Sequence, residues 1–183
     1  MRPPQVDLSG YDSGFTPGHK AARLAWGLAY RLLFRPSPTP LFAWRALLLR
    51  AFGARVARGA HVYPSAKVWA PWNLEMGEHS CLGPDVDCYC VAPVRLGAHA
   101  TVSQYGNLCA ATHDHEDPAH RLVPGPITIG AGAWLAADVF VGPGVTIGEG
   151  AVVGARSSVF KDLPAWMVSH GSPARPVRAR RMR

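Results

Sequence analysis

A hydrophobic residue returns at every sixth position along the C-terminal half of this chain. The series starts at Ile129 and runs for six units without a slip. Its later members are Leu135, Val141, Ile147, Val153 and Val159. In five of the six units the next residue is glycine or alanine, and the fifth place of each unit again carries a small or branched side chain. Repetition at a fixed short period indicates a solenoid of stacked coils.

The chemistry of one unit explains the repeat. The residue in the fifth place and the aliphatic residue of the next unit are two positions apart, so in a strand they point to the same side. Each unit is therefore a short strand followed by a corner, and glycines such as Gly130 and Gly132 suit corners because they tolerate positive φ and close approach. We predict an all-β solenoid over residues 56–165 with one continuous interior.

The same period occurs upstream in shorter registers. These registers are Val56, Val62, Val68 and Leu74; Met76, Leu82 and Cys88; and Leu96, Val102 and Leu108. Shifts of two residues separate some of them, which predicts a corner that gains two residues. Residues 113–126 carry no hexad and contain three prolines, so they are expected to form a loop projecting from a coil.

Composition supports one domain and excludes several classes of protein. The chain has 183 residues, 19 glycines and 17 prolines, which argues against a helical bundle. Its net charge of +7 is compatible with acidic substrates, nucleic acid or a membrane surface. Nucleic acid is not expected, because the C-terminal arginines have no aromatic platform or groove-reading helix beside them. No signal peptide and no apolar run of about 18 residues occurs, so we expect a cytoplasmic protein.

The two flanks differ from the repeat. Residues 1–55 form an N-terminal extension in which helices are predicted over 18–34 and 40–52. These helices would cap the open end of the solenoid or pack against a neighbouring subunit. Because they are apolar and edged with arginine, a peripheral, salt-sensitive contact with an anionic membrane is also considered. Residues 166–183 are expected to be an Arg-rich tail whose last four residues are solvated.

The four cysteines do not suggest a disulfide or metal framework. They are Cys81, Cys88, Cys90 and Cys109, and they lack paired CxxC spacing. In a chain without a secretion signal we expect small, reduced core residues.

The repeat and its flanks together resemble a known family. The segments that carry the resemblance are YDSGFTPG, RLLFRPSPTPLF, PWNLEMGEHSCLGP, VSQYGNLCAATHDHEDP and the hexads through FKDLP. They are similar to the hexapeptide-repeat acyltransferases, most of all to the colanic acid (exopolysaccharide) biosynthesis type, which is related to galactoside and maltose O-acetyltransferases. The resemblance implies a left-handed parallel β-helix, a homotrimer with acetyl-CoA in a cleft between subunits, and acetylation of a sugar hydroxyl. No metal is expected.

The resemblance also implies a catalytic base. A hydroxyl group is a poor nucleophile until its proton is removed, and an imidazole accepts protons near neutral pH. His113, in the motif AATHD at the start of the loop, matches the catalytic histidine of the galactoside and maltose branches. The carboxylate that would orient it is left open among Asp114, Asp87 and Asp117.

Further positions follow from the family pattern. The backbone N–H of Ala137 matches the oxyanion donor, and the backbone of Ala137 and Ala155 would approach the pantetheine arm. Lys161 and Arg175 match positions that meet phosphates of the cofactor. At the acceptor we expect Tyr105, Trp134 and Asp87. Tyr105 stands where many sugar acetyltransferases carry asparagine.

A hexad solenoid is also found in two other functional classes, metal-dependent enzymes and non-catalytic assembly proteins. A metal-dependent carbonic-anhydrase-like β-helix needs three histidine ligands, and His115 and His120 lack a third histidine placed on a coil strand. A non-catalytic assembly protein would keep the hexads but would have no reason to retain a loop that carries a base.

Overall fold

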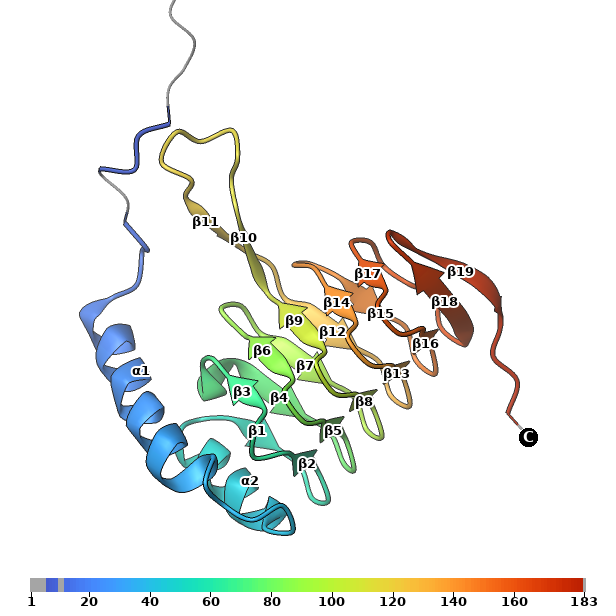
Figure 1. Cartoon of the computed structure of the whole chain (residues 1–183), viewed down its shortest axis with the longest axis horizontal. Helices are drawn as coiled ribbons and strands as arrows, with labels where there is room; N and C mark the ends of the chain where they lie inside the picture. Colours follow the sequence, from blue (N-terminus) through green and yellow to red (C-terminus); the bar gives the residue numbers. More distant parts are fainter. Residues whose placement is uncertain (1–5, 10–11, 183) are drawn as a thin grey trace, which may run out of the picture.

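The computed structural model describes residues 6–9 and 12–182, which form a parallel β-solenoid of about six coils with helices at its N-terminal end (Figure 1). The solenoid has three faces, each a sheet of stacked strands. The first face contains β1 (Arg55–Val56), β4 (Leu74–Met76), β7 (Val94–Leu96), β12 (Ile127–Ile129) and β15 (Thr146–Ile147). The second contains β2 (His61–Val62), β5 (Cys81–Leu82), β8 (Thr101–Val102), β13 (Trp134–Leu135), β16 (Val152–Val153), β18 (Met167–Gly171) and β19 (Ala174–Ala179). The third contains β3 (Lys67–Val68), β6 (Asp87–Tyr89), β9 (Asn107–Cys109), β14 (Phe140–Val141) and β17 (Ser158–Val159).

The hexad residues form the interior, as predicted. Ile129, Leu135 and Val141, one from each face of a single coil, are at most 1% exposed. Upstream, Arg55 pairs with Glu75 and Glu75 with Arg95, so these coils repeat after 20 residues. Downstream, β12 pairs with β15 after 18 residues. The predicted gain of two residues per coil is therefore confirmed.

Glycines at the second and fourth places of a unit have different roles. Gly132, in the fourth place, has φ +63°, a left-handed conformation that costs glycine little. Gly130, in the second place, has no positive φ. A Cβ added there would lie 2.5 Å from the backbone nitrogen of Glu149 in the next coil. The second-place glycine thus allows adjacent coils to approach closely, while the fourth-place glycine makes the turn.

Two helical segments precede the solenoid, close to the predicted ranges. They are α1 (Pro17–Ala29), which continues as the π-helical turn η1 (Tyr30–Phe34), and α2 (Phe42–Ala51). The Thr16 hydroxyl accepts a hydrogen bond from the backbone N–H of His19 and so caps α1. Leu48 and Leu49 of α2 are buried against the first coil, so this helix covers the end of the solenoid.

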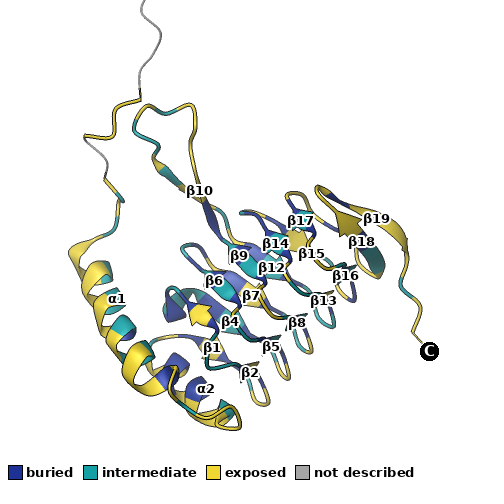
Figure 2. Ribbon diagram, in the orientation of Figure 1, coloured by how far each residue is buried: buried dark blue, intermediate teal, exposed yellow. Residues whose placement is uncertain are grey.

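The outer side of these helices is apolar and exposed (Figure 2). Leu24, Leu28, Leu32 and Leu47 are each more than half exposed, and Trp44 of α2 is also exposed. Within residues 6–9 and 12–182, neither helix is long and apolar enough to cross a membrane.

The predicted loop is a β-hairpin at its base. Strands β10 (Ala111–His113) and β11 (Leu122–Pro124) pair antiparallel and carry the loop away from the coils (Figure 1). The N–H of Asp7, near the N-terminus, donates a 3.0 Å hydrogen bond to the carbonyl of Pro118 in this loop. The loop is therefore held at its base by strand pairing and touched at its tip by the N-terminal segment.

The C-terminal segment differs from the expected tail. Strand β18 extends the parallel ladder of the second face through Val168, which pairs with Val152, and β19 folds back antiparallel on β18. The expectation of four solvated terminal residues is wrong for Arg180, whose Nη1 donates to the carbonyls of Gly132 and Gly150. Hexad spacing is absent from this hairpin, so the repeat gave no sign of it. Arg183 lies outside the described residues.

All four cysteine thiols are free. Cys88 and Cys90 are buried in the core, whereas Cys81 and Cys109 are half-buried. A hydrogen bond with Cys90, together with burial, holds the pKa of Cys88 well above its ordinary value. Cys88 therefore behaves as an inert core residue.

Candidate active site

His113 is the last residue of β10, where it pairs with Leu122 of β11. The next residue continues the hairpin, because the N–H of Asp114 donates to the carbonyl of Arg121 at 2.9 Å. The side chain of His113 is exposed. A strand-paired backbone thus presents this imidazole to solvent at a fixed place on the projecting loop.

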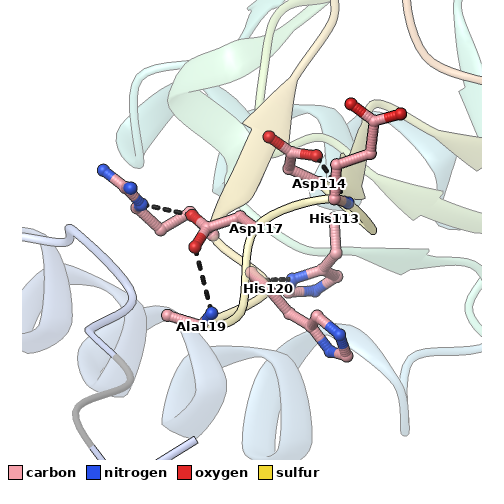
Figure 3. A network of polar contacts seen from close by, with 7 residues as sticks. His113, Asp114, Asp117, Ala119 and His120 are labelled. Carbon is pink, nitrogen blue, oxygen red and sulfur yellow. Dashed lines mark hydrogen bonds and ion pairs between the residues drawn. The ribbon is translucent and has the colours of Figure 1, made fainter. Parts of the chain in front are cut away.

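The Nδ1 atom of His113 lies 2.6 Å from the carbonyl oxygen of His120 (Figure 3). A carbonyl oxygen can only accept, so Nδ1 carries the proton and donates it. The neutral ring then has its lone pair on Nε2. This tautomer can accept a proton from a nucleophile at Nε2, which is the requirement for a general base.

A tight turn sets the direction of the His120 carbonyl. His120 has φ +48°, and its N–H donates to the carbonyl of Asp117 at 2.9 Å. Asp117 in turn accepts from the N–H of Ala119 and forms an ion pair with Arg121. These contacts lower the pKa of Asp117, the hydrogen bond from Ala119 contributing most. The Asp117 carboxylate therefore shapes the turn that orients His113.

The His120 carbonyl is the hydrogen-bond acceptor that orients Nδ1 of His113, and a role for Asp114, Asp87 or Asp117 in orienting the ring stays a prediction. Asp114 accepts the N–H of Glu116 at 2.9 Å through its Oδ1 (Figure 3). Asp87 lies on β6 in the third face, one coil before the strand that leads into the loop, next to Lys67 and Asn107 in the strand register. The sequence suggested His120 only as a possible metal ligand. The role of its backbone carbonyl as the acceptor for His113 could not be predicted from any pattern of side chains.

A second group of predicted residues lines one edge of the solenoid, where the second face turns into the third. Tyr105, Ala137 and Ala155 lie at this corner in three successive coils. The N–H of Asp138 donates to the Gln104 carbonyl, and the N–H of Arg156 donates to Ala137, which stacks the three corners. In the hydrogen bonding of residues 6–9 and 12–182, the N–H groups of Ala137 and Ala155 have no acceptor. This edge therefore offers backbone donors in a row.

Of the three remaining predicted positions, one lies near this edge and two lie elsewhere on the solenoid. Arg175 pairs with His170 in the C-terminal hairpin, whose Gly171 N–H donates to the Ser157 hydroxyl near the same edge. Lys161 follows β17 and is exposed beyond the other end of the third face. Trp134 is half exposed on the second face, and its Nε1 donates to the Ser103 hydroxyl at 3.0 Å.

His113 and the Ala137 edge lie at opposite ends of the strands of the third face. The corner that carries Ala137 precedes β14, whereas the hairpin that carries His113 follows β9, and these two strands are parallel neighbours. One copy of the chain does not bring the imidazole and this backbone donor together.

The sequence and the fold both match known acetyltransferases. Residues 126–161 match the bacterial transferase hexapeptide family (six repeats). The chain is 45% identical over 176 residues to the putative colanic acid biosynthesis acetyltransferase WcaF of Escherichia coli K12, covering 95% of this chain and 97% of that protein. This chain belongs to the hexapeptide-repeat acetyltransferases. A maltose O-acetyltransferase from Clostridium difficile 630 superposes with a TM-score of 0.81 at 24% identity, covering 91% of this chain and 90% of that one. A galactoside acetyltransferase in complex with coenzyme A gives a TM-score of 0.76 at 27% identity, covering 91% and 84%.

This membership distinguishes an enzyme from a non-catalytic assembly protein. Similarity to acetyltransferases extends over nearly the whole chain, flanks and loop included, so the acetyltransferase is an enzyme and not an assembly protein. In the part of the chain that the structure describes, no three His, Cys, Asp or Glu side chains are grouped to hold a metal ion. His120 of this acetyltransferase contributes its carbonyl to the loop instead.

Proposed function

We propose that this acetyltransferase transfers an acetyl group from acetyl-CoA to a sugar hydroxyl during synthesis of an exopolysaccharide or another cell-surface glycan. The observation that carries the proposal is the fixed tautomer of His113, which provides a general base on the projecting loop. Support for the acceptor comes from the relative named for colanic acid biosynthesis and from an E. coli galactoside O-acetyltransferase, 29% identical over 141 residues, 73% of this chain and 68% of that protein. Related structures hold coenzyme A or acetyl-CoA.

In the proposed mechanism the acceptor hydroxyl loses its proton to Nε2 of His113 as its oxygen attacks the thioester carbonyl. The carbonyl oxygen becomes an oxyanion, which the N–H of Ala137 stabilises. Collapse of the tetrahedral intermediate breaks the carbon–sulfur bond. The imidazolium then returns the proton to the leaving thiolate, so the products are the acetyl ester and the thiol of coenzyme A.

The separation of His113 from the Ala137 edge supports a site shared between subunits. We expect a homotrimer in which the loop of one subunit faces the Ala137 edge of its neighbour. The backbone of Ala137 and Ala155 would follow the pantetheine arm, and Arg175 near the same edge would meet the phosphates of the cofactor. Lys161, at the other end of the third face, would reach those phosphates from the neighbouring subunit. Tyr105, Trp134 and Asp87 would contact the acceptor.

The proposed function is tested by thiol release from acetyl-CoA across a panel of acceptors. The panel contains free sugars, nucleotide sugars and lipid-linked sugars, and one class is expected to stimulate release well above hydrolysis without acceptor. Mass spectrometry should find one acetyl ester per product. Release without any acetylated sugar, or with none of the acceptors, would contradict the proposal.

Replacement of Ala137 by proline tests the oxyanion donor. Asp138 has φ +60°, so Ala137 occupies the turn position that proline favours, the one that Pro84 fills before Asp85, φ +55°. Ala137→Pro deletes the N–H with little strain, and kcat should fall about 10²-fold to 10³-fold. The matched control is Ala131→Pro, before Gly132 in the same kind of turn at another corner, which should keep wild-type kcat. Equal effects of the two substitutions would remove the assigned role.

Peripheral contact of the exposed leucine side of α1 and α2 with an anionic membrane stays a prediction. Cosedimentation with anionic vesicles at low salt, lost at high salt, is the expected result. The alternative is that a neighbouring subunit covers this surface, and absence of binding at low salt would favour it.

A further inference from the structure

A pocket of about 420 Å³ lies between α1 with η1 and the outside of the third face. Its strand side is formed by β3 and β6 of the first two coils, which α1 flanks in Figure 1. The catalytic proposal uses none of the helical residues that line it. The pocket is large enough for a sugar unit together with a small charged group.

The lining carries a strong excess of positive charge. Three arginines of the helices, Arg23, Arg31 and Arg35, and Lys67 of β3 surround it, against the single carboxylate of Asp87. Ion pairs elsewhere in the described chain involve other residues, so none of these four cations is neutralised within 4.0 Å by a carboxylate among residues 6–9 and 12–182. Such a concentration of unneutralised charge around a concave site favours an anionic ligand.

Two buried donors of the pocket have no acceptor. Nε of Arg23 and the hydroxyl of Tyr30 are both shielded from solvent and have no hydrogen-bond partner among residues 6–9 and 12–182. The Arg23 guanidinium lies 3.8 Å from the ring centroid of Trp69, which fixes its plane against the pocket wall. Buried polar groups without partners are rare and costly. Because water does not reach these two atoms, a ligand oxygen meets them only when the side chains of the pocket shift on binding.

Arg45 shows what this chain does with a buried arginine that needs no ligand. Its guanidinium donates to three backbone carbonyls and a hydroxyl of the protein itself. Burial lowers the pKa of both Arg45 and Arg23, but only Arg45 has its Nε satisfied. The unsatisfied donor at Arg23 therefore belongs to the pocket and is not a general feature of these helices.

The third face connects the pocket to the loop that carries the base. Asp87 in the pocket wall is the register neighbour of Asn107 on β9, and β10 with His113 follows β9 directly. The Oδ1 atom of Asn107 is also buried and has no hydrogen-bond partner in the part of the chain that the structure describes. An elongated acceptor held in the pocket can thus extend along β6 and β9 towards the loop.

We propose that this pocket binds the phosphate groups of a sugar diphosphate ester and so anchors the acceptor. Planar guanidinium groups form bidentate hydrogen bonds to phosphate oxygens. Trp69 and Tyr89 line the pocket and provide aromatic surfaces for the sugar. The inference rests on the proposed sugar acetylation but makes a claim about binding that can be measured without turnover. The diphosphate can come from a nucleotide sugar or from a lipid-linked sugar.

Titration calorimetry with UDP-glucose, a short-prenyl diphosphate glucose, glucose and glucuronate tests the proposal. One or both diphosphate esters should bind, and the tighter one identifies the source, whereas glucose and glucuronate should bind at least tenfold more weakly. Lys67→Gln and Arg31→Gln remove exposed cations of the lining and should each raise Kd about tenfold. Lys20→Gln, an exposed lysine of α1 outside the pocket, is the matched control and should keep the wild-type Kd.

The outcomes separate this inference from the proposed function. Diphosphate binding that depends on Lys67 and Arg31, with no acetylation of any sugar, would contradict the proposed function but support the assignment of the pocket. Acetylation whose KM for the diphosphate ester is the same in Lys67→Gln and Lys20→Gln would overturn the pocket assignment alone. Binding of glucuronate as tightly as of the diphosphate esters, or a loss of trimer mass in Lys67→Gln without a change in Kd, would also overturn it.

Discussion

Replacement of His113 by alanine is expected to lower kcat for acetyl transfer about 10²-fold to 10⁴-fold, the usual contribution of a general base. KM for acetyl-CoA should change little, because in the proposed mechanism the imidazole acts on the acceptor hydroxyl. The measurement is thiol release at saturating acetyl-CoA with the best acceptor of the panel. Unchanged turnover in this variant would remove His113 from the mechanism.

A second substitution separates loss of the base from damage to the loop. The Nδ1–H of His113 also holds the loop through its 2.6 Å contact with the His120 carbonyl. His113→Asn keeps an N–H donor close to that carbonyl but has no basic nitrogen. We expect His113→Asn to be as inactive as His113→Ala while its melting temperature stays nearer to that of the wild type. Recovery of activity in the asparagine variant would instead assign His113 a positioning role.

Mixing inactive variants tests whether the site is shared between subunits. In the proposed homotrimer, equal amounts of His113→Ala and Ala137→Pro chains give some sites with an intact His113 from one subunit and an intact Ala137 from its neighbour. With random assembly about one quarter of the sites are intact, so about that share of wild-type activity should return. A site within one chain would stay inactive, because each chain carries one of the two defects.

The solenoid could be predicted from sequence because each hexad reports directly on burial. Ile129, Leu135 and Val141 point inward for the same steric reason. A period of six does not fit a helix, and the positive-φ glycines within the units, such as Gly132, turn the chain after each short strand instead of letting it continue as a flat sheet. Even the two-residue gain of the upstream coils was visible, since Leu74 and Met76 are both hydrophobic and both buried.

The geometry of the candidate active site was harder to predict from sequence, because backbone groups form much of it. The carbonyl of His120 faces His113 only because a residue with φ +48° turns the chain, and no residue type encodes that direction. The C-terminal hairpin was missed because β18 joins the ladder through Val168 and Ser169 without any hexad spacing. The pocket beside α1 was also invisible, since it needs Arg23 and Lys67, 44 positions apart in sequence, on facing surfaces.

Replacement of Arg45 by methionine should cost about 3 kcal/mol in free energy of unfolding and lower the melting temperature by about 10 °C. Arg45 is fully buried in α2. Its Nε donates to the carbonyl of Val62 at 2.6 Å, so it joins the helix to the first coil. Its Nη atoms donate to the Ser37 hydroxyl and to the carbonyls of Pro38 and Thr39 at 2.5 to 2.9 Å, so they also fix the turn before α2. Methionine fills much of the volume but leaves these acceptors buried and unsatisfied.

The matched control is Arg50→Met on the same helix. Arg50 is exposed and donates to the carbonyls of Val56 and Ala57, which water can reach once the side chain is gone, so the loss should stay below about 1 kcal/mol. Arg45→Lys separates charge from geometry: one ammonium group cannot meet acceptors on both sides of a planar fork, so most of the loss should remain. A lysine variant as stable as the wild type would show that α2 needs only a buried positive charge. Thermal melting followed by circular dichroism distinguishes these cases. In all three variants kcat at 25 °C should be unchanged. The reason is that the residues contacted by Arg45 and Arg50 lie in the first coil and in the turn before α2, away from the His113 loop.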